Sequence, residues 1–163
     1  MKIMKTIIEK IDKNQKNTDI IREAGRILKE GGLVAFPTET VYGLGADALN
    51  EDAAKKIYAA KGRPSDNPLI IHITNMKALE KIVSEVPEKA VKVAEKYWPG
   101  PLTMILPKAD IVPRETTGGL DSVAVRFPSD RIAQELIKAG GGFVAAPSAN
   151  TSGRPSPTMA EHV

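Results

Sequence analysis

The chain has 163 residues, 42% of them hydrophobic and 26% charged, which is the balance of one globular domain. It contains no cysteine, which excludes a disulfide scaffold, a thiol nucleophile and a Cys-ligated metal. The net charge of +3 is too small to indicate nucleic-acid binding unless the charges cluster. Without a long apolar run, and with an N-terminal stretch 1–16 that lacks a signal-peptide core, the chain is expected to be cytoplasmic, with no membrane partner.

Apolar periodicity and turn residues predict alternating helices and strands along the chain. Helices are expected between an N-cap at Thr18 and the Gly31-Gly32 pair, from Asn50 or Glu51 to Lys61, and over 76–83, 88–97 and 130–139. Strands are expected over 33–36, 69–73, 102–106, 123–127 and 143–146. This order mixes both elements without a strict βαβ alternation, so it favours an α/β (α+β) fold with a twisted mixed sheet flanked by helices.

The chain shows no internal repeat or linker, so residues 1–163 are interpreted as a single domain. The last segment, 159–163, resembles the first turn of a helix. A domain rarely ends in such a turn, so we expect this domain to be truncated at its C-terminal end.

The first ligand-binding candidate is the loop 37–45, which directly follows an apolar strand. Hydroxyl groups and glycines at a strand exit suit a small polar ligand, although the same residues could simply form a structural turn. Within this loop, Gly43-x-Gly45-x-x-Ala48 loosely matches a dinucleotide fingerprint. That motif should follow its strand at once and open a helix, so the match is set aside.

The second candidate is the loop 61–68, in which Lys61 and Arg63 flank a glycine. An ammonium and a guanidinium at this spacing can both reach one polyanion. Alternatively, they could be solvated cations that interact favourably with a helix C-terminus. His72 lies in a run of isoleucines, where a histidine is more often a hydrogen-bonded core residue than a ligand contact.

The third candidate is the loop 147–153, again after an apolar strand. In extended backbone Ser148 and Asn150 point the same way and can contact phosphate, ribose or a base. The alternative is a turn that caps the next element. The sequence predicts no metal site, because no metal-ligand cluster is evident, and no serine lies in a nucleophile-elbow context.

Together, these loops give the chain a resemblance to the YrdC-like threonylcarbamoyl-adenylate synthases. Five blocks occur in the family's order and at family-like spacings, which makes the match highly specific. The blocks are PTETVYGLG (37–45), KGRPSDNPL (61–69), WPGPLT (98–103), GLDSVAVRFP (119–128) and APSANTSG (146–153).

The resemblance implies a basic concave cleft and an L-threonylcarbamoyladenylate synthase. Such an enzyme is a nucleotidyltransferase that forms threonylcarbamoyl-AMP and pyrophosphate from L-threonine, bicarbonate or CO₂, and ATP. It implies Mg²⁺ bound through the ATP phosphates and a downstream threonylcarbamoyl-transferase complex that modifies tRNA to N6-threonylcarbamoyladenosine. It also implies further site residues beyond Val163, because the family domain continues there.

The resemblance assigns roles residue by residue. Catalytic roles fall on Lys61 and Arg63. The ATP contacts are Lys61, Arg63, Asn67, Ser122, Ser148, Asn150 and Ser156. The L-threonine contacts are Thr40, His72, Arg126 and the backbone of Ala146, so in this context His72 changes from a core residue to a substrate contact.

Two other functions stay open from the sequence. An RNA-binding module would fit a tRNA-modification family with a basic cleft, but the chain has only three Phe, three Tyr and one Trp, without the aromatic–basic interleaving that stacks bases. A sensor that binds ATP and threonine without turnover is the other alternative.

Overall fold

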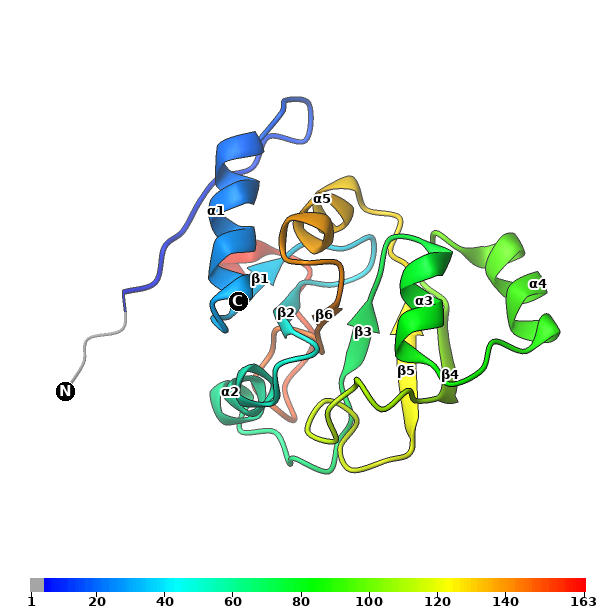
Figure 1. Cartoon of the computed structure of the whole chain (residues 1–163). Coiled ribbons are helices and arrows are strands. Elements are labelled where there is room, and N and C mark those ends of the chain that lie inside the picture. The colour runs from blue at the N-terminus through cyan, green and yellow to red at the C-terminus, as the bar shows by residue number, and fades with distance from the viewer. Residues whose placement is uncertain (1–4) are drawn as a thin grey trace.

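The computed structural model describes residues 5–163, so the first four residues of the stretch 1–16 lie outside it. The described part forms a mixed six-stranded sheet with helices on both sides, which confirms the predicted α/β (α+β) fold but has one strand more than the five expected (Figure 1). Its strands are β1 (Val34–Phe36), β2 (Gly43–Asp47), β3 (Ile70–His72), β4 (Thr103–Pro107), β5 (Ser122–Arg126) and β6 (Val144–Ala145). Its helices are α1 (Thr18–Lys29), α2 (Glu51–Lys61), α3 (Met76–Ile82), α4 (Glu88–Tyr97), α5 (Arg131–Ala139) and a 3-10 turn, η1 (Ala160–His162).

The strand order is β1-β2-β6-β3-β5-β4. Only β3 and β5 pair in parallel, and all other neighbours are antiparallel. In the parallel pair, His72 lies opposite Arg126, and in the antiparallel pair on its other side it lies opposite Val144. Residues that are 50 or more apart in the sequence thus meet in the centre of the sheet.

Local signals fix the ends of α2. The side chain of Asn50 accepts hydrogen bonds from the backbone N–H groups of Asp52 and Ala53 at 3.0 and 3.1 Å, which caps the helix. Gly62 ends the helix in the left-handed region, at φ 60°. Lys61 is therefore the last helical residue. At α1 the prediction was wrong by one position, because Asn17 holds the cap position and Thr18 is already helical.

Strand β2 corrects the prediction that 37–45 is entirely a loop. Gly43–Asp47 forms an antiparallel pair with β1, in which Gly45 lies opposite Val34. A Cβ on Gly45 would lie 2.9 Å from Phe36 Cε1 and 2.9 Å from Val144 Cγ1, so a larger residue would not fit. The strand was missed because it lacks the β-branched and aromatic residues that signal strands, and close packing supplies the reason for its glycines.

The two sides of the sheet are covered unequally. One side packs Ile71, Val125 and Ala145 against α2, α3 and α4. On the other side, α1 and α5 cover Phe36, Val144 and Ala146 of the β1-β2-β6 end. Because successive residues of a strand point to opposite sides, the outward residues of β3, β5 and β4 lie beside this second cluster and belong to neither core. We call this area the open face; its residues are Ile70, His72, Ser122, Ala124, Arg126, Thr103 and Ile105.

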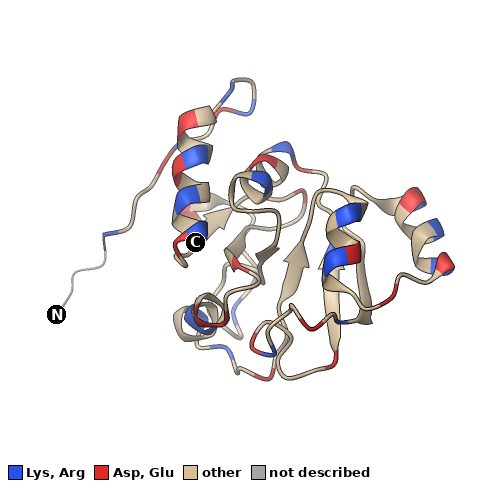
Figure 2. Cartoon of the chain, in the orientation of Figure 1, with Lys and Arg blue, Asp and Glu red and all other residues tan. Residues whose placement is uncertain are grey.

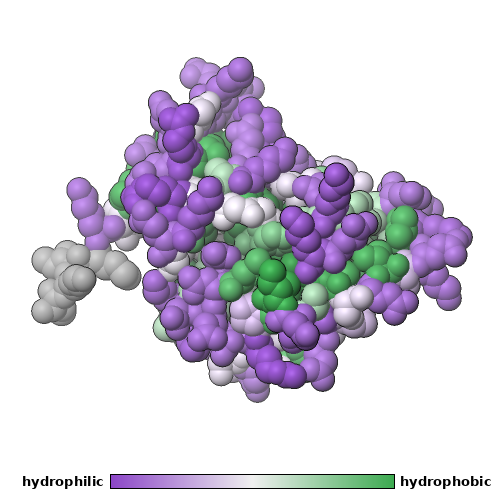
Figure 3. All heavy atoms as spheres, in the orientation of Figure 1, coloured by the Kyte–Doolittle hydropathy of each residue, from purple (hydrophilic) through white to green (hydrophobic). Residues whose placement is uncertain are grey.

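Charged residues of both signs are mixed along the helices (Figure 2), whereas apolar side chains gather in a band on the surface (Figure 3). Acidic and basic residues are interspersed along the helices rather than separated by sign (Figure 2). Apolar side chains form a band between α2 and α3 that continues toward α4 (Figure 3). Exposed apolar residues elsewhere include Ile105, which is 70% exposed at the sheet edge. Within residues 5–163, no helix is both long and apolar enough to cross a membrane.

His72 is buried within the sheet, with 4% of its surface exposed, and its ring meets the Phe36 ring edge-on at 6.1 Å between centroids. Burial, and secondarily the positive charge of Arg126, lower the pKa of His72 to about 4. The imidazole is therefore neutral at physiological pH.

We expect Gly25→Ala to destabilise the fold. A Cβ at Gly25 would lie 2.6 Å from the Cβ, carbonyl carbon and carbonyl oxygen of Ala139 at the end of α5. Replacing glycine by alanine inside a helix usually raises the free energy of unfolding by about 1 kcal/mol. Here the clash should instead lower it by about 1–3 kcal/mol. Chemical denaturation measures the change, and Lys29→Ala on the exposed side of α1 is the control. A Gly25→Ala protein as stable as the wild type would contradict this packing.

His72 should make the fold sensitive to acid. The unfolded state binds a proton on this side chain near pH 6.5, whereas the folded state binds it only near pH 4. The stability contributed by neutral His72 is therefore present above pH 6.5 and lost as the pH falls to 4. Relative to His72→Gln, the wild-type free energy of unfolding should drop by about 3 kcal/mol over this window. Parallel pH profiles of the two proteins in denaturant titrations would refute this expectation.

Candidate functional site

Backbone hydrogen bonds link the loops that were predicted from the sequence. We call residues 37–42 the first loop, 62–68 the second loop and 147–157 the third loop. Backbone bonds join the first and third: Tyr42 N–H donates to Pro157 O at 2.8 Å, and Ala149 N–H donates to Tyr42 O at 2.8 Å. Ser152 N–H donates to Lys61 O at 2.8 Å, which ties the third loop to the residue where the second begins.

Lys61 is enclosed by the third loop. Only 3% of its surface is exposed, and its ammonium donates to the carbonyl oxygens of Ser148 and, at 2.5 Å, Asn150. Burial, and secondarily the nearby charge of Arg63, lower the pKa of Lys61. An ammonium has three N–H donors, so these two carbonyls leave one for a ligand. Lys61 therefore shapes the third loop and also brings a positive charge to it.

Arg63 stabilises the second loop through hydrogen bonds to two of its carbonyl oxygens. Its Nε donates to Asn67 O at 3.2 Å and its Nη2 donates to Pro68 O at 3.0 Å. Burial lowers the pKa of this half-buried guanidinium. A guanidinium carries five N–H donors, so these two hydrogen bonds fix the orientation of Arg63 and leave its other donors available to a ligand. Asn67 itself is exposed beside it.

Ser148 and Asn150 lie on the same side of the third loop, where Ser148 Oγ bonds Asn150 Oδ1 at 2.5 Å. The Asn150 amide nitrogen donates to Thr151 O and Arg154 O at 2.9 and 2.8 Å. An open pocket of about 450 Å³ adjoins them, and it is lined by Leu44, Ala60, Lys61, Ala149, Asn150, Thr151, Arg154, Pro155, His162 and Val163. Two of the predicted ATP contacts, Lys61 and Asn150, therefore face a common cavity.

Two other predicted nucleotide contacts, Ser122 and Ser156, lie outside the cavity that Lys61 and Asn150 line. Ser122 opens β5 on the open face, opposite Pro107. Ser156 is exposed on the third loop, next to the carbonyl that receives Tyr42 N–H. Neither lines the 450 Å³ pocket.

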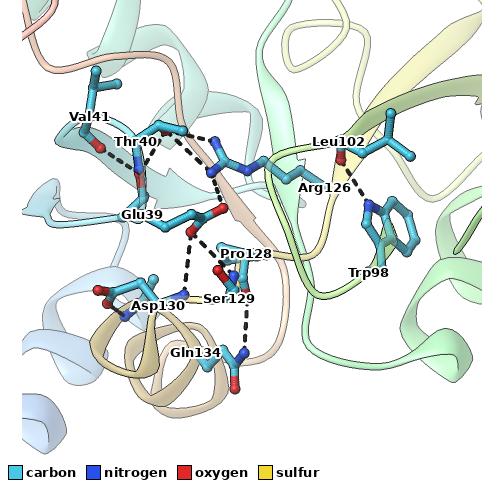
Figure 4. Close-up of polar contacts among 12 residues, drawn as sticks. Glu39, Thr40, Val41, Trp98, Leu102, Arg126, Pro128, Ser129, Asp130 and Gln134 are labelled. Carbon is cyan, nitrogen blue, oxygen red and sulfur yellow. Dashed lines mark hydrogen bonds and ion pairs between the residues drawn. The ribbon is translucent and has the colours of Figure 1, made fainter. Parts of the chain in front are cut away.

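Of the four predicted threonine contacts, His72, Arg126 and Thr40 meet at the open face, and the backbone of Ala146, whose side chain lies in the second cluster, adjoins them. His72 and Arg126 are register partners, and Ala146 N–H donates to Ile70 O at 2.9 Å on the neighbouring strand. Thr40 reaches this group from the first loop, where its Oγ1 accepts from both Nη1 and Nη2 of Arg126 at 3.3 Å (Figure 4). The fold thus joins Thr40 to a residue 86 positions away.

Within this group His72 can only be a neutral partner. Its Nδ1 lies 3.0 Å from Ile70 O. Because a carbonyl can only accept, we assign the single imidazole proton to Nδ1, which leaves Nε2 as an acceptor.

Glu39 also belongs to this group of contacting side chains, and it was not among the residues predicted from the sequence. One carboxylate oxygen pairs with Arg126 Nη2, and the other accepts from the backbone N–H groups of Ser129 and Asp130 (Figure 4). The available signal was that Glu39 is the one charged residue in the stretch 37–45. Its partner could not be identified from the sequence, because the contact spans 87 positions.

The described part of the chain offers no evident cluster of metal ligands. Across residues 5–163, His, Asp and Glu side chains do not gather in groups of three or more that could hold one. The charged groups of the site are instead cations that suit anionic ligands, namely Lys61, Arg63 and Arg126, with Glu39 as a local counter-ion.

Comparison with known proteins finds relatives in both sequence and fold. Residues 26–163 match the family Sua5/YciO/YrdC, described as telomere recombination. The chain is 60% identical over 143 residues to threonylcarbamoyl-AMP synthase of Pyrococcus abyssi and 52% identical over 164 residues to that of Bacillus subtilis. It also superimposes, with a TM-score of 0.87 and 56% identity, on the crystal structure of P. abyssi Sua5 complexed with L-threonine, covering 94% of this chain and 44% of that one.

These relatives are longer proteins. The match covers 88% of this chain but 42% of the P. abyssi relative, and 100% of this chain but 47% of the B. subtilis relative. The chain therefore spans less than half the length of either one. On the extent of the family match, on the identity to these relatives and on the shared fold, the chain belongs to the Sua5/YciO/YrdC family.

Proposed function

We propose that this chain carries the ATP- and L-threonine-binding site of an L-threonylcarbamoyladenylate synthase. The observation that carries the proposal is the meeting of Arg126, Thr40 and His72 at the open face, together with the hydrogen bonds that join the first loop to the third loop, which encloses Lys61. A carboxylate-binding fork is thus linked through the first loop to a cationic loop suited to phosphates. The names of the relatives and the L-threonine complex of P. abyssi Sua5 support this choice of substrates.

The proposed reaction has two steps. The threonine amine attacks CO₂, derived from bicarbonate, and loses a proton to give a carbamate. A carbamate oxygen then attacks the α-phosphate of ATP, and the bond from that phosphorus to the pyrophosphate oxygen breaks. The products are threonylcarbamoyl-AMP and pyrophosphate. Such transfers depend mainly on positioning and charge neutralisation, so a nucleophilic side chain is unnecessary.

The cations have separate tasks in this proposal. Arg126 pairs with the threonine carboxylate, while the free N–H donors of Lys61 and Arg63 stabilise charge on the phosphates. The side chains that surround the nucleotide are Asn67, Ser122, Ser148, Asn150 and Ser156. Thr40, the Ala146 backbone and the Nε2 acceptor of His72 contact threonine. Mg²⁺ would be carried by the ATP phosphates, since oxygen-rich polyphosphate is a site it prefers.

The proposal extends to the partners. The product would pass to a complex that transfers the threonylcarbamoyl group to tRNA in the cytoplasm. The matched relatives are longer than this chain, and residues 1–163 would supply the nucleotide-binding part of such a synthase.

The direct test is pyrophosphate release from ATP by the full-length protein, measured with and without L-threonine and bicarbonate. We expect release that requires both, because the carbamate is the nucleophile. Pyrophosphate release that does not depend on threonine would exclude the proposed synthase activity. Binding of ATP and threonine without turnover would instead indicate a sensor, and tight salt-sensitive tRNA binding without ATP binding would indicate an RNA-binding module.

Replacing Lys61 tests the role of the third loop. Lys61→Ala removes the ammonium bonded to Ser148 O and Asn150 O, so kcat/KM for ATP should fall by about 100-fold or more. The affinity for threonine, which binds at the open face, should change little. Lys55→Ala, on the exposed side of α2, is the matched control. Circular dichroism checks the fold, and Arg63→Ala provides a second variant. Equal losses for both substrates would contradict the separate tasks of these cations.

A further inference from the structure

Building on the proposed function, we infer that Glu39 is a positioning residue for the substrate carboxylate. Its own carboxylate holds the Arg126 guanidinium in the orientation that receives the ligand, and it fastens that guanidinium to the start of α5. Glu39 therefore acts on threonine binding through Arg126 rather than by contact with the reacting atoms.

The two oxygens of Glu39 have different partners. Oε1 forms the ion pair with Arg126 Nη2, while Oε2 accepts from Ser129 N–H at 3.2 Å and Asp130 N–H at 3.3 Å. Asp130 caps α5, because its Oδ1 accepts from Ala133 N–H at 2.9 Å. The positive end of the helix dipole favours an anion at this place. The carboxylate thus bridges the first loop, strand β5 and helix α5 (Figure 4).

The pair is well shielded from solvent, with 11% of the Arg126 side chain and 20% of the Glu39 side chain exposed. Desolvation by burial alone would raise the pKa of Glu39, but the hydrogen bond from Arg126 and the backbone N–H groups outweigh it and the pKa is lowered. Glu39 is thus an anion at neutral pH. In such surroundings, removing Glu39 would leave the positive charge of Arg126 uncompensated, so the guanidinium would adopt another orientation.

The remaining donors of Arg126 show why its orientation matters. Glu39 and Thr40 receive hydrogen bonds from Nη1 and Nη2 only. Arg126 Nε is buried and lacks a hydrogen-bond partner among residues 5–163. A guanidinium held at one end can present the rest of its fork to an incoming carboxylate. Glu39 is held in turn by backbone N–H groups at its other oxygen, so it can stay in place when the ligand arrives.

Calorimetry on the full-length protein tests this inference with a double-mutant cycle. Glu39→Ala should weaken L-threonine binding by about 10- to 100-fold, because a misplaced guanidinium loses its aligned hydrogen bonds. Binding of ATP should stay within about twofold, and Glu39→Asp should restore part of the loss. In an Arg126→Ala background, the added Glu39→Ala change should have little further effect. Glu30→Ala, which removes an exposed ion-pair partner of Arg26, is the control.

A second readout does not need threonine. The ¹⁵N NMR signals of the Arg126 Nη groups should show slow rotation in the wild type and faster rotation in Glu39→Gln. If the wild type binds no threonine, the proposed function is wrong, while this NMR difference still decides whether Glu39 holds Arg126. The inference is overturned by unchanged rotation, by equal losses for ATP and threonine, or by an undiminished Glu39→Ala effect without Arg126.

Discussion

Buried charge must be compensated, and this constraint shapes the site more than any other. Lys61 and Arg126 both lie below the surface of a small domain, where an unpaired cation would be costly. Each is surrounded by oxygens from a different part of the chain. Carbonyls of the third loop enclose Lys61, and the first loop brings Glu39 and Thr40 to Arg126. The conformations of the first and third loops are therefore stabilised by the hydrogen bonds with which their oxygens compensate these buried cations.

The sheet provides the frame for these pairs. Helices α2, α3 and α4 pack on one side of the sheet, and α1 and α5 cover only the β1-β2-β6 end of the other, so the register partners His72 and Arg126 meet next to the part that α1 and α5 cover. The glycines of β2 contribute by allowing close packing against Phe36 and Val144. Loops that follow strands, such as the first and third loops, are a common setting for ligands in α/β folds.

The secondary structure was largely predictable. Helix α4 has the expected bounds, and α2, α3 and α5 differ from expectation by one residue at most, because caps such as Asn50 and Asp130 act within a few positions. Strand β2 was not predictable, since its two glycines carry no strand signal and depend on residues that are distant in the sequence. The partners of the charged groups were hidden for the same reason, and Glu39 is the clearest case.

By itself, the sequence determined the order of most elements, the three polar loops, and, through the ordered family blocks, the kinship and the candidate ligands. These are local properties, because caps, turns and short motifs act over a few residues. Only the tertiary structure decided that Lys61 holds the third loop and that Glu39 holds Arg126. Those pairs join residues 87 or more positions apart, so they exist only after the sheet has set its register.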